Sequence, residues 1–569
     1  MTPVLQADST SAVSSVALRT WTKTTSALLL AVLVISTVVI IHGIHRGEFS
    51  YNVDETQHAM TGFFVADLIR DHPLRHPVEY AYQYYAQYPA LSGVIHWPPF
   101  FYLFEGVTFL LLGPSVVSAR LVILAFSLLG ITFWFLMLRE LQNQWLAAAA
   151  SIFLACAPSV LLFEKAVMLE MPCLAFCLPA IWFWTRYLLQ KKPADVYLFA
   201  LFASAAALTK QNAVYLIPFC LFSGSILSGW RLFVRPAVLK AMVIGLVLSA
   251  PFYTVVYLVH WKTIAMDLTE KNASKAQAAS FYWKAIPDQI GWVTILLAIV
   301  GVVTSRRWAT PKVTTIMLSW IAACYVTFTL IGHKEPRYAM YWIPPFTYFA
   351  LGPLFSYFRK PPLRIAAGAA AVVLIGSSVV FAWSFQRPYI AGYEQAAERV
   401  TQISKAGVIL YDAPLAGNFI FFLHANDAGR HFMVLRKALY ATRLKQSGGS
   451  VELVHSPEEI QQLIRDYGVR FFVVSEGNSL KFDSQRMLRD LLKQPNFREI
   501  GTFDIQGHDL PSPNLELRLY ENMAWTRPAG KFLRIKMLTL NHDIVLPMER
   551  FTVSDTPANQ PASPQPGVR

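Results

Sequence analysis

Two adjacent acids, Asp54 and Glu55, follow directly on a long apolar run, within the stretch YNVDETQHAM at residues 51–60. A carboxylate beside a bilayer surface can be an idle group in a solvated turn. It can also be part of a site in which it takes a proton from a hydroxyl group. For an isolated acidic pair the sequence leaves both interpretations open. The choice depends on which other polar groups reach the same side of the membrane.

Further ionisable groups stand at the ends of later apolar segments. They are Glu164, Lys165, Glu170, Lys210 and those in GHKEPRYAMYW at 332–342. Lysine and arginine side chains stabilise a developing negative charge, and arginine can bind a phosphate through two hydrogen bonds. In the topology derived below, these acids and bases end on one face of the membrane. Ionisable groups beside spans are costly and usually functional, so their gathering favours a site over an idle turn.

The elements that must position these residues are membrane spans. Of the 569 residues, 54% are hydrophobic and 15% charged, and the mean hydropathy is +0.40. Apolar runs long enough to cross a bilayer recur through the first two thirds of the chain, which predicts a polytopic α-helical membrane protein. The predicted spans are roughly 24–44, 117–138, 145–163, 172–189, 195–208, 212–229, 237–258, 290–304, 313–331, 338–357 and 364–384. The apolar stretch Phe100 to Gly113 is short and contains Glu105, and we expect it to be interfacial or re-entrant.

The positive-inside rule fixes the orientation of these eleven spans. If residues 100–113 do not cross, every cytoplasmic loop is basic, and Arg19 and Lys23 place the N-terminus inside. The C-terminal region is then outside the cytoplasm. Much of the net charge of +14 lies in the short inner loops, so it is a topology signal, and no nucleic-acid partner is predicted. All five cysteines lie in or at the ends of apolar segments, which indicates neither a disulfide framework nor a zinc site.

A different pattern begins near Gln386. AGVILYD (406–412) is typical of a buried strand, and residues 451–476 read as strand, helix and strand. Ser456, followed by Pro457 and three residues later by Glu459, predicts the start of the helix. Strands alternating with helices predict a small α/β domain with a largely parallel sheet. It lacks a glycine-rich phosphate loop, and we expect a structural or acceptor-docking role for it.

These patterns predict four regions. They are a cytoplasmic tail at 1–23, a transmembrane catalytic domain at 24–385 with its first outer loop at 45–116, an extracytoplasmic α/β domain at 386–553 and a disordered, proline-containing tail at 554–569.

Six short motifs carry a family resemblance over roughly residues 24–385. In chain order they are the DE pair, HWPPFFYLFEG from His96, SARL from Ser118, FEKAVMLEMP from Phe163, LTKQNAVYLIP from Leu208 and KEPRYAMYWIPP from Lys334. Their order and their common side resemble the GT-C glycosyltransferases, especially the protein-mannosyltransferase-like and aminoarabinose-transferase-like group. The resemblance implies the GT-C fold with about 11 or more transmembrane helices and with juxtamembrane helices in the first outer loop. It also implies transfer of a sugar from a polyprenyl phosphate, undecaprenyl phosphate in a bacterial inner membrane, to an acceptor at the outer face.

The resemblance assigns catalysis to three acids. Asp54 and Glu55 would form the catalytic pair, one of them serving as general base for the acceptor hydroxyl. Glu170 would be the acid of the next outer loop, although Glu-Met-Pro stands where the family usually has Asp, a small residue and Pro. A pairing of Glu170 with Lys165 is the structural alternative.

The resemblance assigns binding of the donor phosphate to Lys210, Lys334, Arg337 and Tyr338, which match the family's TKG motif and its late basic motif. Gln211 replaces the glycine of the first motif. His96 and Trp97 are candidate substrate-binding residues, with Trp97 standing where the family often has His or Lys before two prolines. Snorkelling of Lys210 and simple anchoring by Arg337 are the structural alternatives.

Direct transfer from the phosphate would invert the anomeric centre, with no covalent enzyme intermediate. A divalent metal would require Asp54, Glu55 and Glu170 to converge, and the sequence leaves metal dependence open. It does not identify the sugar or say whether the acceptor is a glycan, a lipid or a protein. The alternative function is a transporter or flippase for a lipid-linked or anionic substrate. The absence of an inverted repeat and the clustering of charges at one face count against it.

Overall fold

The computed structural model describes residues 20–50, 53–91, 97–269, 275–357, 361–436, 438–442, 450–476, 480–509, 515–528, 530–537 and 542–552. Contacts divide the chain into two compact units. The first unit contains Met1–Ile44, Ile95–Phe101 and Arg120–Gln386, and the second contains His45–Val94, Tyr102–Ala119 and Arg387–Arg569. His96, residues 1–19 of the predicted tail and the predicted C-terminal tail 554–569 lie outside the described residues.

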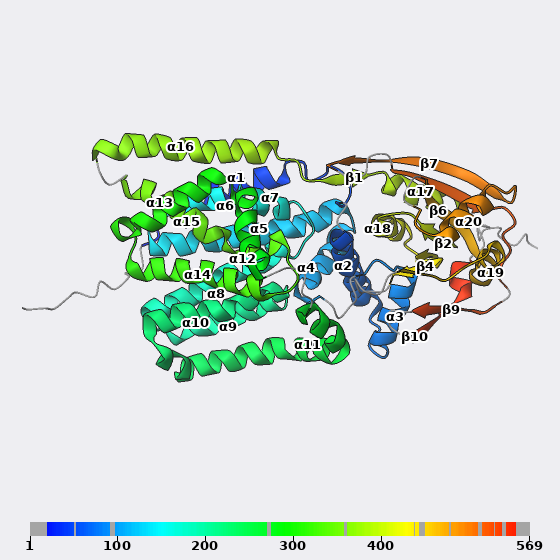
Figure 1. Ribbon diagram of the computed structural model, residues 1–569, viewed down its shortest axis with the longest axis horizontal. Coiled ribbons are helices and arrows are strands. Elements are labelled where there is room, and N and C mark those ends of the chain that lie inside the picture. Colours follow the sequence, from blue (N-terminus) through cyan, green and yellow to red (C-terminus); the bar gives the residue numbers. More distant parts are fainter. Residues whose placement is uncertain are drawn as a thin grey trace, which may run out of the picture. The chain divides into compact units, whose positions relative to one another are not determined.

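The first unit is helical, and Figure 1 shows most of its long helices running in similar directions. Its helices are α1 (Lys23–Ile41), most of α5 (Val116–Leu141), α6 (Gln144–Ala155), α7 (Pro158–Glu164), α8 (Glu170–Gln190), α9 (Pro193–Ala207), α10 (Leu216–Ser228), α11 (Pro236–Thr269), α12 (Lys275–Ile290), α13 (Trp292–Trp308), α14 (Pro311–Leu330), α15 (Ile343–Tyr357) and α16 (Pro361–Ser384). Two 3₁₀ turns, η1 (Gln211–Tyr215) and η3 (Pro336–Trp342), precede α10 and α15.

Seven helices in the described residues are long and apolar enough to cross a membrane, and two bent pairs raise the number to nine if each pair is one span. The pairs are α6 with α7, bent by 69°, and the end of α12 with α13, bent by 111°. The predicted spans 195–208 and 338–357 correspond to α9 and α15, which have 15 residues each. The polytopic helical class is therefore confirmed, while the number of eleven spans stays a prediction.

The second unit combines three helices of the predicted first outer loop with the C-terminal sheet. The helices are α2 (Val53–Asp71), α3 (Pro77–Gln87) and α4 (Phe100–Leu112), of which residues 102–112 belong to this unit. The C-terminal part contains β1 (Tyr389–Ala391), α17 (Tyr393–Ile403), β2 (Gly407–Asp412), α18 (Ala416–Asn426), β3 (Phe432–Arg436), β4 (Tyr440–Thr442), β5 (Ser450–Glu452), α19 (Pro457–Tyr467), β6 (Val469–Glu476), α20 (Asp483–Leu492), β7 (Phe497–His508), β8 (Leu515–Asn522), β9 (Phe532–Met537), β10 (His542–Pro547) and η4 (Met548–Phe551).

The main sheet has the order β1-β7-β8-β6-β2-β3. β2 pairs in parallel with β3 and β6, whereas the β6–β8, β8–β7 and β7–β1 pairs are antiparallel. The prediction of a largely parallel sheet is therefore wrong, since three of its five strand pairs are antiparallel. The chain moves from β2 to β3 in one direction and from β3 to β6 in the other. Right-handed crossovers therefore put α18 and α19 on opposite faces, as Figure 1 shows.

The helix predicted after Ser456 is confirmed together with its capping box. The Ser456 hydroxyl accepts a hydrogen bond from the Glu459 amide at 3.2 Å, and the Glu459 carboxylate accepts one from the His455 amide at 2.7 Å. These bonds satisfy amides that the first turn of α19 leaves unpaired.

Hydrogen bonds and ion pairs join the first-loop helices to the C-terminal part within the second unit. Asp67 of α2 accepts hydrogen bonds from Tyr84 of α3 and from His424 of α18, both at 2.9 Å. Arg430 holds Asp71 through two bonds of 2.6 and 2.9 Å. The domain limits predicted at 385 and 386 remain predictions, but the compact units cut the chain differently because these bonds tie residues 67–84 to residues 424–430.

Candidate active site

Three charged residues converge in the first unit from three separate loops. Glu170 begins α8, Lys210 precedes η1, and Arg337 lies in η3. The Lys210 ammonium donates to Glu170 Oε1 at 2.5 Å, and Arg337 Nε lies 3.5 Å from the same oxygen. The Glu170 side chain is fully buried, and those of Lys210 and Arg337 are 2% and 16% exposed. Lys165, the partner considered for Glu170 from the sequence, donates to the His42 carbonyl at 3.2 Å.

Aromatic rings border this cluster. The Lys210 ammonium lies 5.6 Å from the centre of the Trp97 ring, and the Arg337 guanidinium lies 6.0 Å from that of Tyr338. Both distances are within the range of a cation–π contact. Trp97 and Tyr338, two of the predicted site residues, thus lie beside the predicted cations. His96 lies outside the described residues.

Lys334 has a different environment. Its ammonium donates to the carbonyls of Phe328 at 3.0 Å, Thr329 at 2.6 Å and Ile331. These are carbonyls at the C-terminal end of α14, where a cation also complements the helix dipole. Partial burial lowers the pKa of Lys334 below its ordinary value. The geometry thus gives Lys334 a helix-capping role, and its contact with a phosphate stays a prediction.

The cluster of Glu170, Lys210 and Arg337 contains two cations and one carboxylate. If all three are ionised, these three side chains together carry a net charge of +1 in a nearly dry place. Such a charge attracts an anion strongly, because little water is present to screen it. The lysine offers further N–H donors and the arginine a planar fork, which together suit a phosphate group. The arrangement can therefore bind a phosphate and stabilise it as a leaving group.

Asp54 and Glu55 belong to the second unit, where they form the first turn of α2. The solvated turn considered from the sequence is not what forms there, because the helix begins at Val53. Acids in a first turn are favoured by the helix dipole and by unpaired amides. The Glu55 side chain is fully buried and accepts a hydrogen bond of 2.5 Å from the Ser50 amide. Asp54 is half-buried.

Arg387 is a residue that the sequence reasoning missed. Its Nη1 atom lies 3.2 Å from Glu55 Oε1, and its Nη2 atom donates to the Glu48 carbonyl at 2.8 Å. It stands in FQRPY, directly after α16, and is separated from Glu55 by 332 positions. No local sequence signal links the two residues, so only the fold could show the pair.

No group of three or more His, Cys, Asp or Glu side chains that could hold a metal occurs among the described residues. Glu170 has a lysine as its nearest charged partner and Glu55 an arginine. The convergence that a metal site would require of Asp54, Glu55 and Glu170 therefore stays a prediction.

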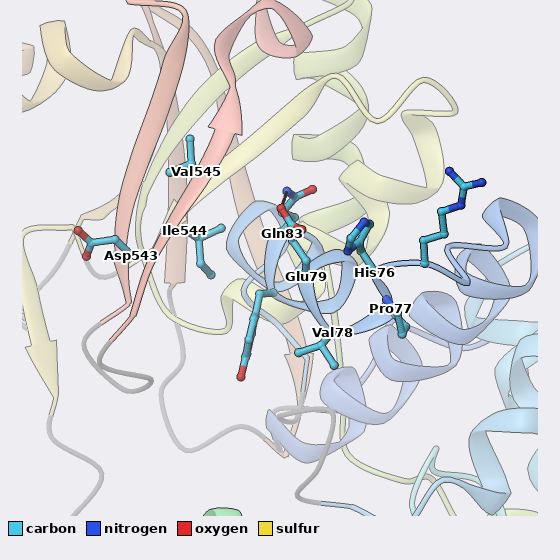
Figure 2. Close-up of a pocket in the computed structure, with 10 residues that line it drawn as sticks. His76, Pro77, Val78, Glu79, Gln83, Asp543, Ile544 and Val545 are labelled. Atoms are coloured by element: carbon cyan, nitrogen blue, oxygen red, sulfur yellow. Dashed lines mark hydrogen bonds between the residues drawn. The ribbon is translucent and has the colours of Figure 1, made fainter.

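A groove of about 580 Å³ opens in the second unit between α3 and β10. Figure 2 shows His76, Glu79 and Gln83 on the helix side and Ile544 and Val545 on the strand side. None of the predicted catalytic or phosphate-binding residues lines this groove. We assign the groove no part in the chemistry.

Comparison with known proteins bears on this site. Residues 96–254 match the family model described as dolichyl-phosphate-mannose-protein mannosyltransferase. This segment includes Trp97, Glu170 and Lys210. No curated protein matches the chain by sequence.

Solved structures match over most of the chain. ArnT from Cupriavidus metallidurans bound to undecaprenyl phosphate is similar with a TM-score of 0.59 and 14% sequence identity, over 88% of this chain and 98% of that chain. The same protein in the apo state gives a TM-score of 0.55 at the same identity and coverage. The oligosaccharyltransferase of Archaeoglobus fulgidus gives 0.51 at 12% identity, over 79% of this chain and 68% of that chain. The resemblance to the GT-C group stated from the sequence is confirmed by these comparisons.

Proposed function

We propose that this membrane protein, which has the GT-C fold and matches the protein-mannosyltransferase family model, is an inverting glycosyltransferase. It transfers a sugar from a polyprenyl phosphate, undecaprenyl phosphate in a bacterial inner membrane, to an acceptor at the outer face. The relative ArnT has been solved with undecaprenyl phosphate bound. In this proposal the N-terminus is cytoplasmic and the second unit is extracytoplasmic.

The observation that carries the proposal is the cluster of Lys210, Arg337 and Glu170. When the sugar–phosphate bond breaks, the electron pair stays with the phosphate oxygen and the negative charge there increases. Lys210 and Arg337 stabilise that charge in a site from which water is largely excluded. Glu170 holds the lysine at 2.5 Å and so keeps its ammonium in place before the donor binds.

The second requirement is a base for the acceptor hydroxyl. Glu55 is fully buried and held by Arg387, which favours a positioning role for it. Asp54, its half-buried neighbour in the same turn, is then the group that takes the proton. The hydroxyl oxygen attacks the anomeric carbon, the phosphate leaves from the opposite side, and the configuration at that carbon inverts.

The test is transfer from a radiolabelled polyprenyl-phosphate sugar pool in membranes that contain the full-length protein. We expect label in an acceptor with the wild type and a loss of 10² to 10⁴-fold in rate with Asp54→Asn, as is usual when a general base is removed. Glu398→Gln, an exposed acid on α17, is the matched control and should be as active as the wild type. Undiminished transfer by Asp54→Asn would remove Asp54 from catalysis. If the wild type transferred no sugar, the transporter alternative would take precedence.

A further inference from the structure

A small cavity in the second unit opens where the parallel strands β2 and β3 end. It has a volume of about 30 Å³ and lies at the amino end of α18, beside the first turns of α2. Gln57 of α2, Asn418 of α18 and Arg436 of β3 line it. The two helices touch here, because a Cβ atom on Gly417 would come within 2.1 Å of the Thr56 hydroxyl. Crevices at the carboxyl ends of parallel strands are the usual place of ligand sites in α/β sheets.

The amino end of α18 has no side-chain cap among the described residues, although the Asn418 amide donates to the Leu415 carbonyl at 3.1 Å. Its N-cap residue, Leu415, makes no side-chain hydrogen bond to the first turn. The first amides of a helix have no intrahelical acceptor and carry a partial positive charge. Helix ends of this kind bind anions when a ligand supplies the acceptor.

Asn418 gives independent evidence for a ligand. Its side chain is 1% exposed, and its Oδ1 atom has no hydrogen-bond partner among the described residues. A buried amide without a partner costs free energy, so buried polar groups are normally satisfied. Because the oxygen and nitrogen of such an amide are assigned and not observed, the group can present either a donor or an acceptor to the cavity.

Arg436 supplies the charge. It is half-buried and donates to the Pro89 carbonyl at 3.2 Å, and no carboxylate of the described residues lies within 4.0 Å of it. The nearby Asp412 is bound to Arg489 instead. An arginine in this setting is suited to a planar or tetrahedral oxyanion.

We propose that this cavity is an oxyanion site, which binds the carboxylate or phosphate group of a ligand between α18, Arg436 and Gln57. A volume of about 30 Å³ holds roughly two water molecules, so it accepts the oxygens of such a group and leaves the rest of the ligand outside. Gln57 stands three residues after Asp54 on α2. If the proposed transferase function holds, the ligand is the acceptor, anchored by its anionic group within one helical turn of the base.

The experiment uses the purified full-length protein in detergent and inorganic phosphate as the probe. Binding of radiolabelled phosphate is measured by equilibrium dialysis at constant ionic strength, with acetate and chloride as competitors. We expect saturable binding to the wild type that chloride does not displace. Arg436→Gln and Gln57→Glu should each weaken it at least tenfold, the first by removing the cation and the second by adding a carboxylate. Because Gln57 is half-buried and on a different element, Gln57→Glu keeps the proposal testable if Arg436→Gln fails to fold.

Two further variants separate this site from a general effect of charge. Arg436→Lys should restore most of the binding, and Arg465→Gln, on the exposed face of α19, should bind as the wild type does. Competition by acetate would point to a carboxylate ligand, and its absence to a phosphate. Absence of specific phosphate and acetate binding, or equal phosphate binding by the wild type, Arg436→Gln and Gln57→Glu, would overturn the proposal. If the wild type transfers no sugar but phosphate binding still depends on Arg436, the oxyanion site is supported and the proposed transferase function is rejected.

Discussion

The guanidinium of Arg387 lies 3.2 Å from the carboxylate of Glu55, and only 6% of the arginine side chain and none of the glutamate side chain is exposed. The first residue of the second unit's C-terminal segment therefore holds one member of the acidic pair at the start of α2. A buried carboxylate with such a partner is fixed in position and poorly placed to move protons. The C-terminal segment of the second unit thus contacts the turn that carries Asp54.

Disrupting this pair should destabilise the second unit. Arg387→Met removes one partner of a buried ion pair, which typically costs about 3–5 kcal/mol. Unfolding of the protein in detergent by heat or denaturant measures this loss in the free energy of unfolding. The double variant Glu55→Gln/Arg387→Met should lose less than the sum of the single variants, by about 0.5–3 kcal/mol. Arg486→Met, from an exposed pair with Asp483 on α20, is the control and should cost at most about 1 kcal/mol. Additive losses at Glu55 and Arg387 would show that the pair is not coupled.

Glu55→Gln should reduce transfer less than Asp54→Asn does. The amide keeps the shape of Glu55 and loses only its charge, so the effect on rate comes through the position of the turn. We expect a loss of about tenfold, against 10² to 10⁴-fold for the base. Rates normalised to the amount of folded protein give the comparison. A loss for Glu55→Gln equal to or greater than that for Asp54→Asn would make Glu55 the base.

Lys210→Met should slow the transfer of the sugar from the lipid donor. The substitution removes one of the two cations from the buried cluster, so kcat/KM for the lipid donor should fall about 10²-fold or more. Initial rates at varied donor concentration measure it. Lys192→Met, at the exposed start of α9, should leave the rate unchanged. An unchanged kcat/KM in Lys210→Met would mean that this lysine only supports the structure.

The stability of the second unit should fall as the pH rises from about 4.5 to 7. Burial raises the pKa of Glu48 to about 7, although its carboxylate accepts bonds from the Gly392 and Glu394 amides. Between the unfolded and folded pKa values the folded state holds more protons, so raising the pH favours unfolding, by up to about 3 kcal/mol for this group. Unfolding midpoints at pH 5, 6, 7 and 8 should fall more steeply for the wild type than for Glu48→Gln. Parallel curves for the two proteins would exclude Glu48 as the cause.

The sequence predicted the parts of the fold that depend on local pattern. Apolar runs predicted the helices, and the Ser456 and Glu459 pair predicted the start of α19 together with its cap. The charges of the loops also predicted that Glu170, Lys210 and Arg337 lie on the same side of the membrane. In the structure the three side chains come together. Their roles in binding a phosphate remain predictions, as does the catalytic role of Asp54.

Other features depend on contacts that no local pattern encodes. Glu55 and Arg387 meet across 332 positions, and His424 and Asp67 across 357. Lys334 caps α14 because the chain turns back there, which a motif match does not reveal. One antiparallel pair of the sheet did have a local signal. Only six residues separate β7 from β8, and strands joined by so short a connection are usually antiparallel.

The division of the second unit among distant segments has a consequence for biosynthesis. Residues 45–94 and 102–119 are made early, whereas Arg387, His424 and Arg430 leave the ribosome about 300 residues later, a delay of tens of seconds at 5–20 residues per second. Until then Glu55, Asp67 and Asp71 lack the bonds that Arg387, His424 and Arg430 supply in the folded protein. A chain that ends near residue 386 would keep its spans but would stay in this immature state. Quality-control proteases and chaperones would then meet the nascent α2 and α3 before their C-terminal partners exist.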